Sequence, residues 1–298
     1  MKIGETRRPD ASLLGRAATS RNVHVTQERL ETDPTLLAQL LTTGRVGDAR
    51  WYGVVESYAV DLRASPSIQP PLFEAMLPHL WGAWQETLLF DVCRDATSTF
   101  NSALFHRPNL IAEVIDPATQ RQVEVFVRDS LILASDAEEV SKADLRWVPF
   151  WTSAVSWWPS MMAEVWDRLS DGPRVGHALS ILVYLSRFAY RDAENPLIAE
   201  ASRLAPLWAQ ASFDSALHWS PEAIAAFSDR LEWSRVEGYL RAAVAGLATD
   251  ARSEELQLVA SDIQENRRDL FLKRRSVLLR HLSSGGLDRF WDDEIGID

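Results

Sequence analysis

The sequence predicts an all-α fold on three observations. Glycine is scarce, at 13 of 298 residues, and few segments alternate apolar and polar residues as strands do. Most of the chain instead repeats apolar residues at helical spacing. Prolines that follow a polar residue mark helix starts, because proline suits the first helical position and lacks only an amide that would be unpaired there. These starts are Asp33-Pro34, Asp116-Pro117, Asn195-Pro196 and Ser220-Pro221, with Pro70-Pro71 and Trp158-Pro159 as weaker marks.

Three helices are predicted before residue 96. Residues 33–44 read DPTLLAQLLTTG, in which four leucines form one face and Gly44 is a plausible stop. Apolar residues recur at helical spacing in residues 48–65, from Trp51 to Leu62, and again in residues 72–95. Each of these segments therefore predicts an amphipathic helix.

Residues 121–135, RQVEVFVRDSLILAS, fit two patterns. Val123, Val125 and Val127 alternate as in a strand, whereas Val123, Phe126, Val127 and Leu131 recur at helical spacing. The Asp116-Pro117 start favours a helix. A small β-hairpin near 122–134 is the alternative.

The second half is predicted to be helical as well. Residues 175–190, VGHALSILVYLSRFAY, are apolar nearly all round, which predicts a central buried helix. Further helices are predicted over residues 196–211, 221–233, 235–248 and 253–282.

The proline-marked starts at residues 34, 71, 117, 159 and 196 are separated by 37, 46, 42 and 37 residues, near the spacing of helical-pair repeats. The blocks share no residue signature, and Pro221 breaks the spacing. An irregular multi-helix bundle and a solenoid-like stack of helix pairs are therefore both kept as architectures.

The preferred organisation is a flexible N-terminal tail over residues 1–22 and one helical domain over 23–298. The polar segment 134–146 is a candidate internal boundary. Cys93 is the only cysteine, no secretory signal is evident, and the longest apolar runs are far too short to span a membrane. We therefore expect a cytoplasmic protein that does not enter the membrane.

A cluster of tryptophans between residues 147 and 166 is the densest aromatic feature. Several of its residues lie three or four positions apart, which places them on one helical stripe. Such a cluster is typical of a crowded core, but tryptophan is also enriched at binding surfaces. The candidate partner-binding residues are Trp147, Trp151, Trp157, Trp158 and Trp166.

The predicted C-terminal helix is strongly basic, although the net charge of the chain is −11. Leu256, Ile263, Leu270 and Val277 repeat every seven residues, which predicts a buried stripe. The basic face could pair with acidic residues of the same protein, contact phosphate, nucleic acid or an acidic partner, or form a helical oligomer seam. The candidate contact residues are Arg267, Arg268, Lys273, Arg274 and Arg275.

Residue patterns for metal and cofactor binding are missing from the sequence. No two histidines lie within one helical turn, a single cysteine cannot form a thiolate zinc site, and no phosphate-binding glycine motif occurs. We therefore predict no metal and no cofactor.

The leading functional hypothesis is a non-catalytic helical scaffold, adaptor or inhibitor (immunity-type) protein with an acidic surface, because acidic surfaces accelerate capture of basic partners. A helical enzyme is the runner-up, with an apolar pocket near Trp81, Trp84, Trp151 and Trp158 for a prenyl-diphosphate-like substrate. Asp91 and Asp95 lie one turn apart and could hold magnesium, but the D-D-x-x-D pattern is missing. Nucleic-acid contact through residues 267–280 is a third hypothesis, and the oligomeric state is left open.

Overall fold

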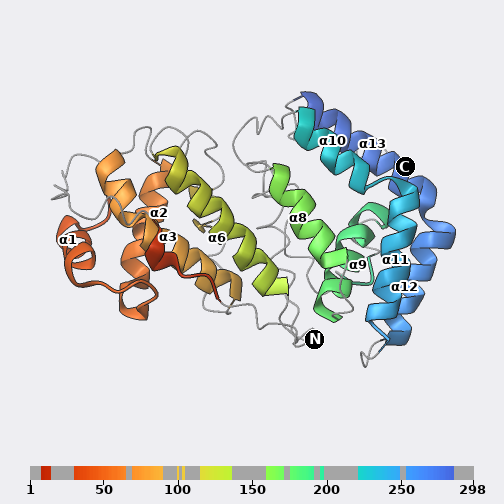
Figure 1. The fold of residues 1–298 in the computed structure, drawn as a ribbon, viewed down its shortest axis with the longest axis horizontal. Helices are drawn as coiled ribbons and strands as arrows, with labels where there is room; N and C mark the ends of the chain where they lie inside the picture. Colours follow the sequence, from red (N-terminus) through yellow and green to blue (C-terminus); the bar gives the residue numbers. More distant parts are fainter. Residues whose placement is uncertain are drawn as a thin grey trace. The chain divides into compact units, whose positions relative to one another are not determined.

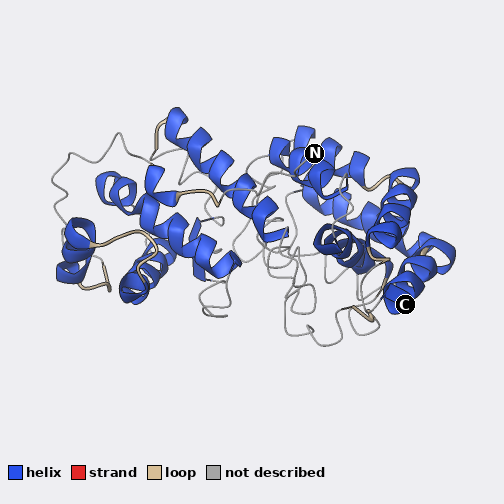
Figure 2. Ribbon diagram, turned by 60° about the horizontal axis from the view of Figure 1, so that its bottom comes forward, coloured by secondary structure: helices blue, strands red, loops and turns tan. Residues whose placement is uncertain are grey.

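The computed structural model describes residues 8–14, 30–64, 69–89, 99–100, 103–104, 115–135, 159–170, 175–190, 195–197, 221–248 and 253–284. Within these ranges it contains ten α-helices and no strand, which confirms the all-α prediction (Figure 2). The chain divides into two compact units, Met1–Leu133 and Ala134–Asp298, next to the candidate boundary at 134–146.

The described part of the first unit (red to yellow in Figure 1) includes four α-helices and two short 3-10 turns. The elements are η1 (Ala11–Leu13), α1 (Pro34–Thr43), η3 (Ala49–Trp51), α2 (Tyr52–Ala64), α3 (Pro70–Leu89) and α6 (Pro117–Ser135), whose last residues pass the unit boundary. Of the two alternatives for residues 122–134, the structure thus forms the helix and not the hairpin.

Local capping explains where these helices begin and end. The Asp33 side chain accepts a hydrogen bond from the Thr35 amide at 2.8 Å, and Pro34 opens α1 as predicted. Asp116 caps α6 in the same way, through the amides of Ala118 and Thr119. Gly44 ends α1 at a negative φ, so the left-handed conformation is not the reason for glycine there. A Cβ at Gly44 would instead collide with the Leu40 carbonyl oxygen.

Helix α3 contributes more buried residues to the core of the first unit than any other described helix. Trp81 and Trp84 are fully buried and meet edge to face, with ring centroids 5.4 Å apart, and Phe126 of α6 lies against Trp84. Because these two rings pack against their neighbours, they act as core residues. The other residues of the predicted enzyme pocket, Trp151, Trp158, Asp91 and Asp95, lie outside the described residues.

Residues 8–14 differ from the prediction of a flexible tail over 1–22. They form η1, in which Asp10 caps the turn, and they pack on α3 with Ala11 and Leu14 buried. The prediction relied on the lack of a continuous apolar face, whereas in residues 8–14 two buried side chains and several polar contacts place the segment.

The second unit (green to blue in Figure 1) is built around one central helix. Its helices are α8 (Pro159–Ser170), α9 (Val175–Ala189), α10 (Pro221–Arg230), α11 (Trp233–Gly246), α12 (Ser253–Asn266) and α13 (Arg268–Ser284). Helix α9 packs against α8, α11, α12 and α13, which confirms the prediction of a central helix over residues 175–190. Contacts of one helix with four others are typical of a bundle, whereas repeats in a solenoid touch only their neighbours.

Aromatic rings fill the interior of the second unit. The Trp166 indole is fully buried and meets the rings of Tyr184 and Tyr239 edge to face, at centroid distances of 5.2 and 5.3 Å. Phe188 and Phe271 extend the same cluster toward α13. Among the described residues, no helix combines the length and the apolar character that crossing a membrane requires.

Candidate functional site

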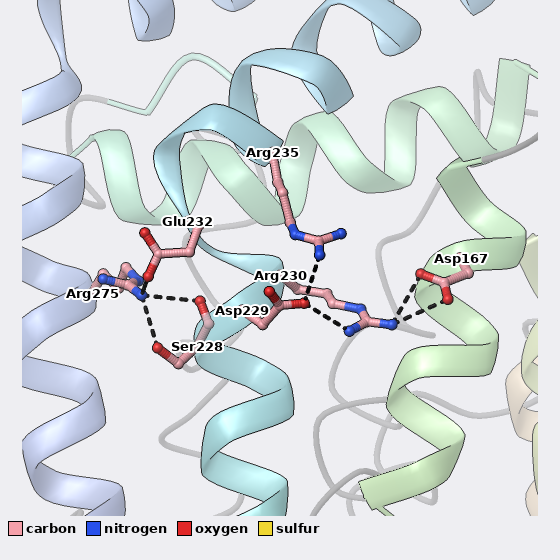
Figure 3. A network of polar contacts seen from close by, with 7 residues as sticks. All are labelled: Asp167, Ser228, Asp229, Arg230, Glu232, Arg235 and Arg275. Carbon is pink, nitrogen blue, oxygen red and sulfur yellow. Dashed lines mark hydrogen bonds and ion pairs between the residues drawn. The ribbon is translucent and has the colours of Figure 1, made fainter.

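Arginines on three helices of the second unit, α10, α11 and α13, form a polar network near the junction of α10 and α11, and α8 contributes an aspartate to it (Figure 3). Arg230 donates to both carboxylate oxygens of Asp167 on α8, at 3.1 and 3.2 Å, and to Asp229 at 3.1 Å. Asp229 also forms an ion pair with Arg235 of α11 at 3.1 Å. One nitrogen of Arg230, Nη2, thus contacts both oxygens of Asp167, and the other, Nη1, contacts Asp229.

Arg275 completes this network from α13. Its Nη2 donates to the carbonyl and the hydroxyl oxygen of Ser228, at 3.0 and 2.8 Å, and forms an ion pair with Glu232 (Figure 3). The side chain of Arg275 is only 13% exposed. Since a largely covered guanidinium that already contacts three acceptors offers little to a ligand, Arg275 serves to join α13 to α10.

Arg274 is the most deeply buried cation of the predicted basic set, at 6% exposed. Its Nη1 donates to the backbone carbonyl of Tyr190, at the end of α9. Burial of a charge is costly unless hydrogen bonds compensate, so this contact positions α13 against α9. Lys273, the preceding residue, is exposed.

Tyr190 is also the centre of a second polar cluster at the boundary between α12 and α13. Its hydroxyl donates to Asp262 at 2.7 Å, and Arg267 donates from Nε to the same carboxylate at 3.0 Å while its guanidinium lies over the Tyr190 ring. Burial alone would raise the pKa of Asp262, but hydrogen bonds from Tyr190, Asn266 and Arg267 lower it below the ordinary value. Asp262 is therefore ionised at neutral pH, and its negative charge pairs with the positive charge of Arg267.

Burial is the main cause that raises the pKa of Tyr190, and the hydrogen bond to Asp262 raises it further. The Tyr190 hydroxyl therefore stays protonated and acts as a donor.

Arg268 stacks over the Trp233 ring, with its Cζ 5.6 Å from the centroid. Of the five predicted phosphate-contact residues, Arg267, Arg268, Arg274 and Arg275 thus have contacts within the second unit. Contact of this basic face with other residues of the same protein was one of the alternatives predicted from the sequence.

The solvent face of α12 has the opposite character. Within residues 253–266 the helix has four carboxylates and no lysine or arginine. Leu258 is 71% exposed, more than any other large hydrophobic residue that the structure describes. Residues one or two helical turns from it, Glu254, Ser261 and Glu265, are on the same stripe and are exposed or nearly so.

Leu258 is not among the candidate residues predicted from the sequence. The sequence does predict the buried stripe of α12, and Leu256 and Ile263 are indeed buried at 1% and 0% exposed. Leu258 lies off that stripe, between acidic residues one turn away on either side. An apolar residue on the polar face of an amphipathic helix was the signal that could have identified it.

The structure places one of the five candidate tryptophans. Trp166 lies in the core of the second unit, where its indole has no exposed surface. Trp147, Trp151, Trp157 and Trp158 lie outside the described residues, so their predicted role in partner binding stays a prediction. Among the described residues, no group of three or more His, Cys, Asp or Glu side chains is placed to hold a metal ion.

The chain matches no protein-family model, no curated protein and no solved structure.

Proposed function

We propose that the protein acts as a non-catalytic binding protein, a scaffold, adaptor or inhibitor, and that the acidic face of α12 contacts a basic protein partner. The observation that supports this most strongly is Leu258, an apolar side chain 71% exposed on a helix with three exposed carboxylates, Glu254, Glu255 and Glu265. A central apolar contact surrounded by charges is a common arrangement of protein interfaces.

The charge distribution along α12 and α13 supports a basic partner over a nucleic acid. Arg274 and Arg275 are covered by contacts with α9 and α10, which reduces the cationic surface available to phosphate. The carboxylates Glu254, Glu255 and Glu265 are exposed. Acidic surfaces attract basic partners over long distances and accelerate their association at low salt.

The proposal predicts that Leu258→Lys abolishes partner capture, because it removes the apolar contact and adds a charge that repels a basic surface. The tagged chain is used to capture proteins from cells that contain it naturally, at low salt and then at about 0.5 M salt. We expect a basic protein that is retained at low salt and released at high salt. Retention should fall about tenfold or more with Leu258→Lys.

Val60→Lys is the matched control, because Val60 is also exposed (42%) and gains the same charge, but lies on α2 of the first unit. Both substitutions are at the surface, so each is expected to change stability by less than about 0.5 kcal/mol. Equal retention by the two variants would contradict a partner site on α12.

A further inference from the structure

The N-terminal segment, residues 8–14, makes its contacts with α3, more than seventy positions further along the chain. It touches α3 through polar groups at one end and buried apolar side chains at the other. Each set of contacts resembles the recognition of a short peptide more than the packing of two helices.

Gln85 of α3 is the polar centre of this contact, and it is only 2% exposed. Its Nε2 donates to the backbone carbonyl of Pro9 at 3.2 Å and to the Ser130 hydroxyl of α6 at 2.8 Å. Its Oε1 accepts from Arg8 Nε at 2.9 Å, and Arg8 also forms an ion pair with Glu86. Ser130 thus orients an amide whose other two hydrogen bonds go to the segment.

Loss of the segment would remove both of those hydrogen bonds from Gln85. Water would then reach this amide, and an occupant that replaces the segment would have to supply a carbonyl and a cationic donor to restore the same hydrogen bonds. A peptide backbone next to an arginine side chain supplies both groups.

Apolar anchors hold the other end of the segment. Ala11 and Leu14 are 4% and 3% exposed, whereas Leu13 between them is 47% exposed. Gly82 of α3 lies next to Ala11, and a Cβ built there would be 3.5 Å from Ala11 Cβ and 2.6 Å from Val46 Cγ1. Glycine at this position therefore leaves room for the Val46 side chain, while Ala11 lies at ordinary contact distance beside it.

The segment also holds its own conformation. Asp10 accepts from the Ser12 amide at 2.9 Å and from the Ser12 hydroxyl at 2.6 Å, and the Leu14 amide donates to the Ala11 carbonyl at 3.0 Å. Local bonds of this kind reduce the ordering that binding requires.

We propose that the surface of α3 around Gln85 and Gly82 is a peptide-binding site that residues 8–14 occupy in cis as an exchangeable strap. The site fits a segment of another protein that has an arginine next to a free backbone carbonyl, followed by a small residue and a leucine. The three side chains must have the same spacing as Arg8, Ala11 and Leu14. Such a segment competes with the strap. This site is on a different unit from the α12 face and does not depend on it.

The test begins with the full chain, folded and then cut at a specific protease site introduced between residues 15 and 29. After the N-terminal fragment is removed by dilution, a fluorescent peptide of residues 1–20 is titrated and its anisotropy is measured. We expect the labelled peptide to bind saturably and unlabelled peptide to displace it. The remainder, which is the cut chain without its N-terminal fragment, should keep its helical circular dichroism.

Matched peptides distinguish a specific site from general adhesion. Leu14→Ala should weaken binding at least about thirtyfold, because it truncates a buried anchor. Leu13→Ala, at the exposed neighbouring leucine, should change it less than about twofold. Arg8→Ala should weaken it about fivefold, since this arginine is partly exposed.

Three results would overturn the proposal. The first is unfolding of the cut chain once the fragment is removed, and the second is failure of the peptide to rebind. The third is equal affinity of the site for the Leu13→Ala and Leu14→Ala peptides. Leu258→Lys in the cut chain should leave the peptide affinity unchanged. The two proposals can therefore fail separately.

Discussion

Replacement of Trp166 by alanine is expected to lower the free energy of unfolding of the second unit by about 3–5 kcal/mol. The indole is fully buried and makes edge-to-face contacts with Tyr184 of α9 and Tyr239 of α11. Truncation would leave a cavity where α8, α9 and α11 meet, and the surrounding rings could fill it only in part.

Urea denaturation followed by far-ultraviolet circular dichroism measures this loss. Trp166→Phe is the control, because it retains an aromatic ring in the cavity and should cost less than half as much. A loss below about 1 kcal/mol for Trp166→Ala would contradict the buried position of the ring.

Arg274→Ala is expected to destabilise the second unit by about 2–4 kcal/mol. The substitution removes the donor to the Tyr190 carbonyl and the apolar stem of a side chain that is 6% exposed. The loss should therefore weaken the packing of α13 on α9.

Lys273→Ala is the matched control, because it removes the same charge from the neighbouring, exposed position on α13. It should change stability by less than about 0.5 kcal/mol in the same denaturation experiment. If both variants lost the same stability, Arg274 would have no special role in the fold.

Several features could be predicted from sequence because they are local. An aspartate before a proline was enough to place the starts of α1 and α6, since the capping side chain and the proline act within one turn. The all-round apolar pattern of residues 175–190 was enough to identify α9 as the central helix.

The roles of individual cations could not be predicted, because they depend on contacts between distant residues. Lys273 and Arg274 are neighbours of equal charge, but Lys273 is exposed, whereas Arg274 is buried and donates to the Tyr190 carbonyl, 84 residues away. The tryptophan pattern likewise identified a dense aromatic region without showing that Trp166 faces the core.

The N-terminal strap shows the same limit. Residues 8–14 have too few apolar side chains to predict packing by themselves. Their position depends on Gln85, 76 residues from Pro9, and on the space that Gly82 leaves. Neither residue has a feature in the sequence that points to the N-terminus.

The central claim is that arginines of α13 stabilise the fold while the acidic face of α12 remains available to a basic partner. Its most direct test is a fluorescence anisotropy titration of the chain, at low salt, with a labelled arginine-rich peptide and with a labelled duplex oligonucleotide. We predict that the peptide binds more tightly, and that Leu258→Lys weakens this binding several-fold more than Val60→Lys, which adds the same charge. Tighter binding of the oligonucleotide, lost on Arg268→Glu, would contradict the claim.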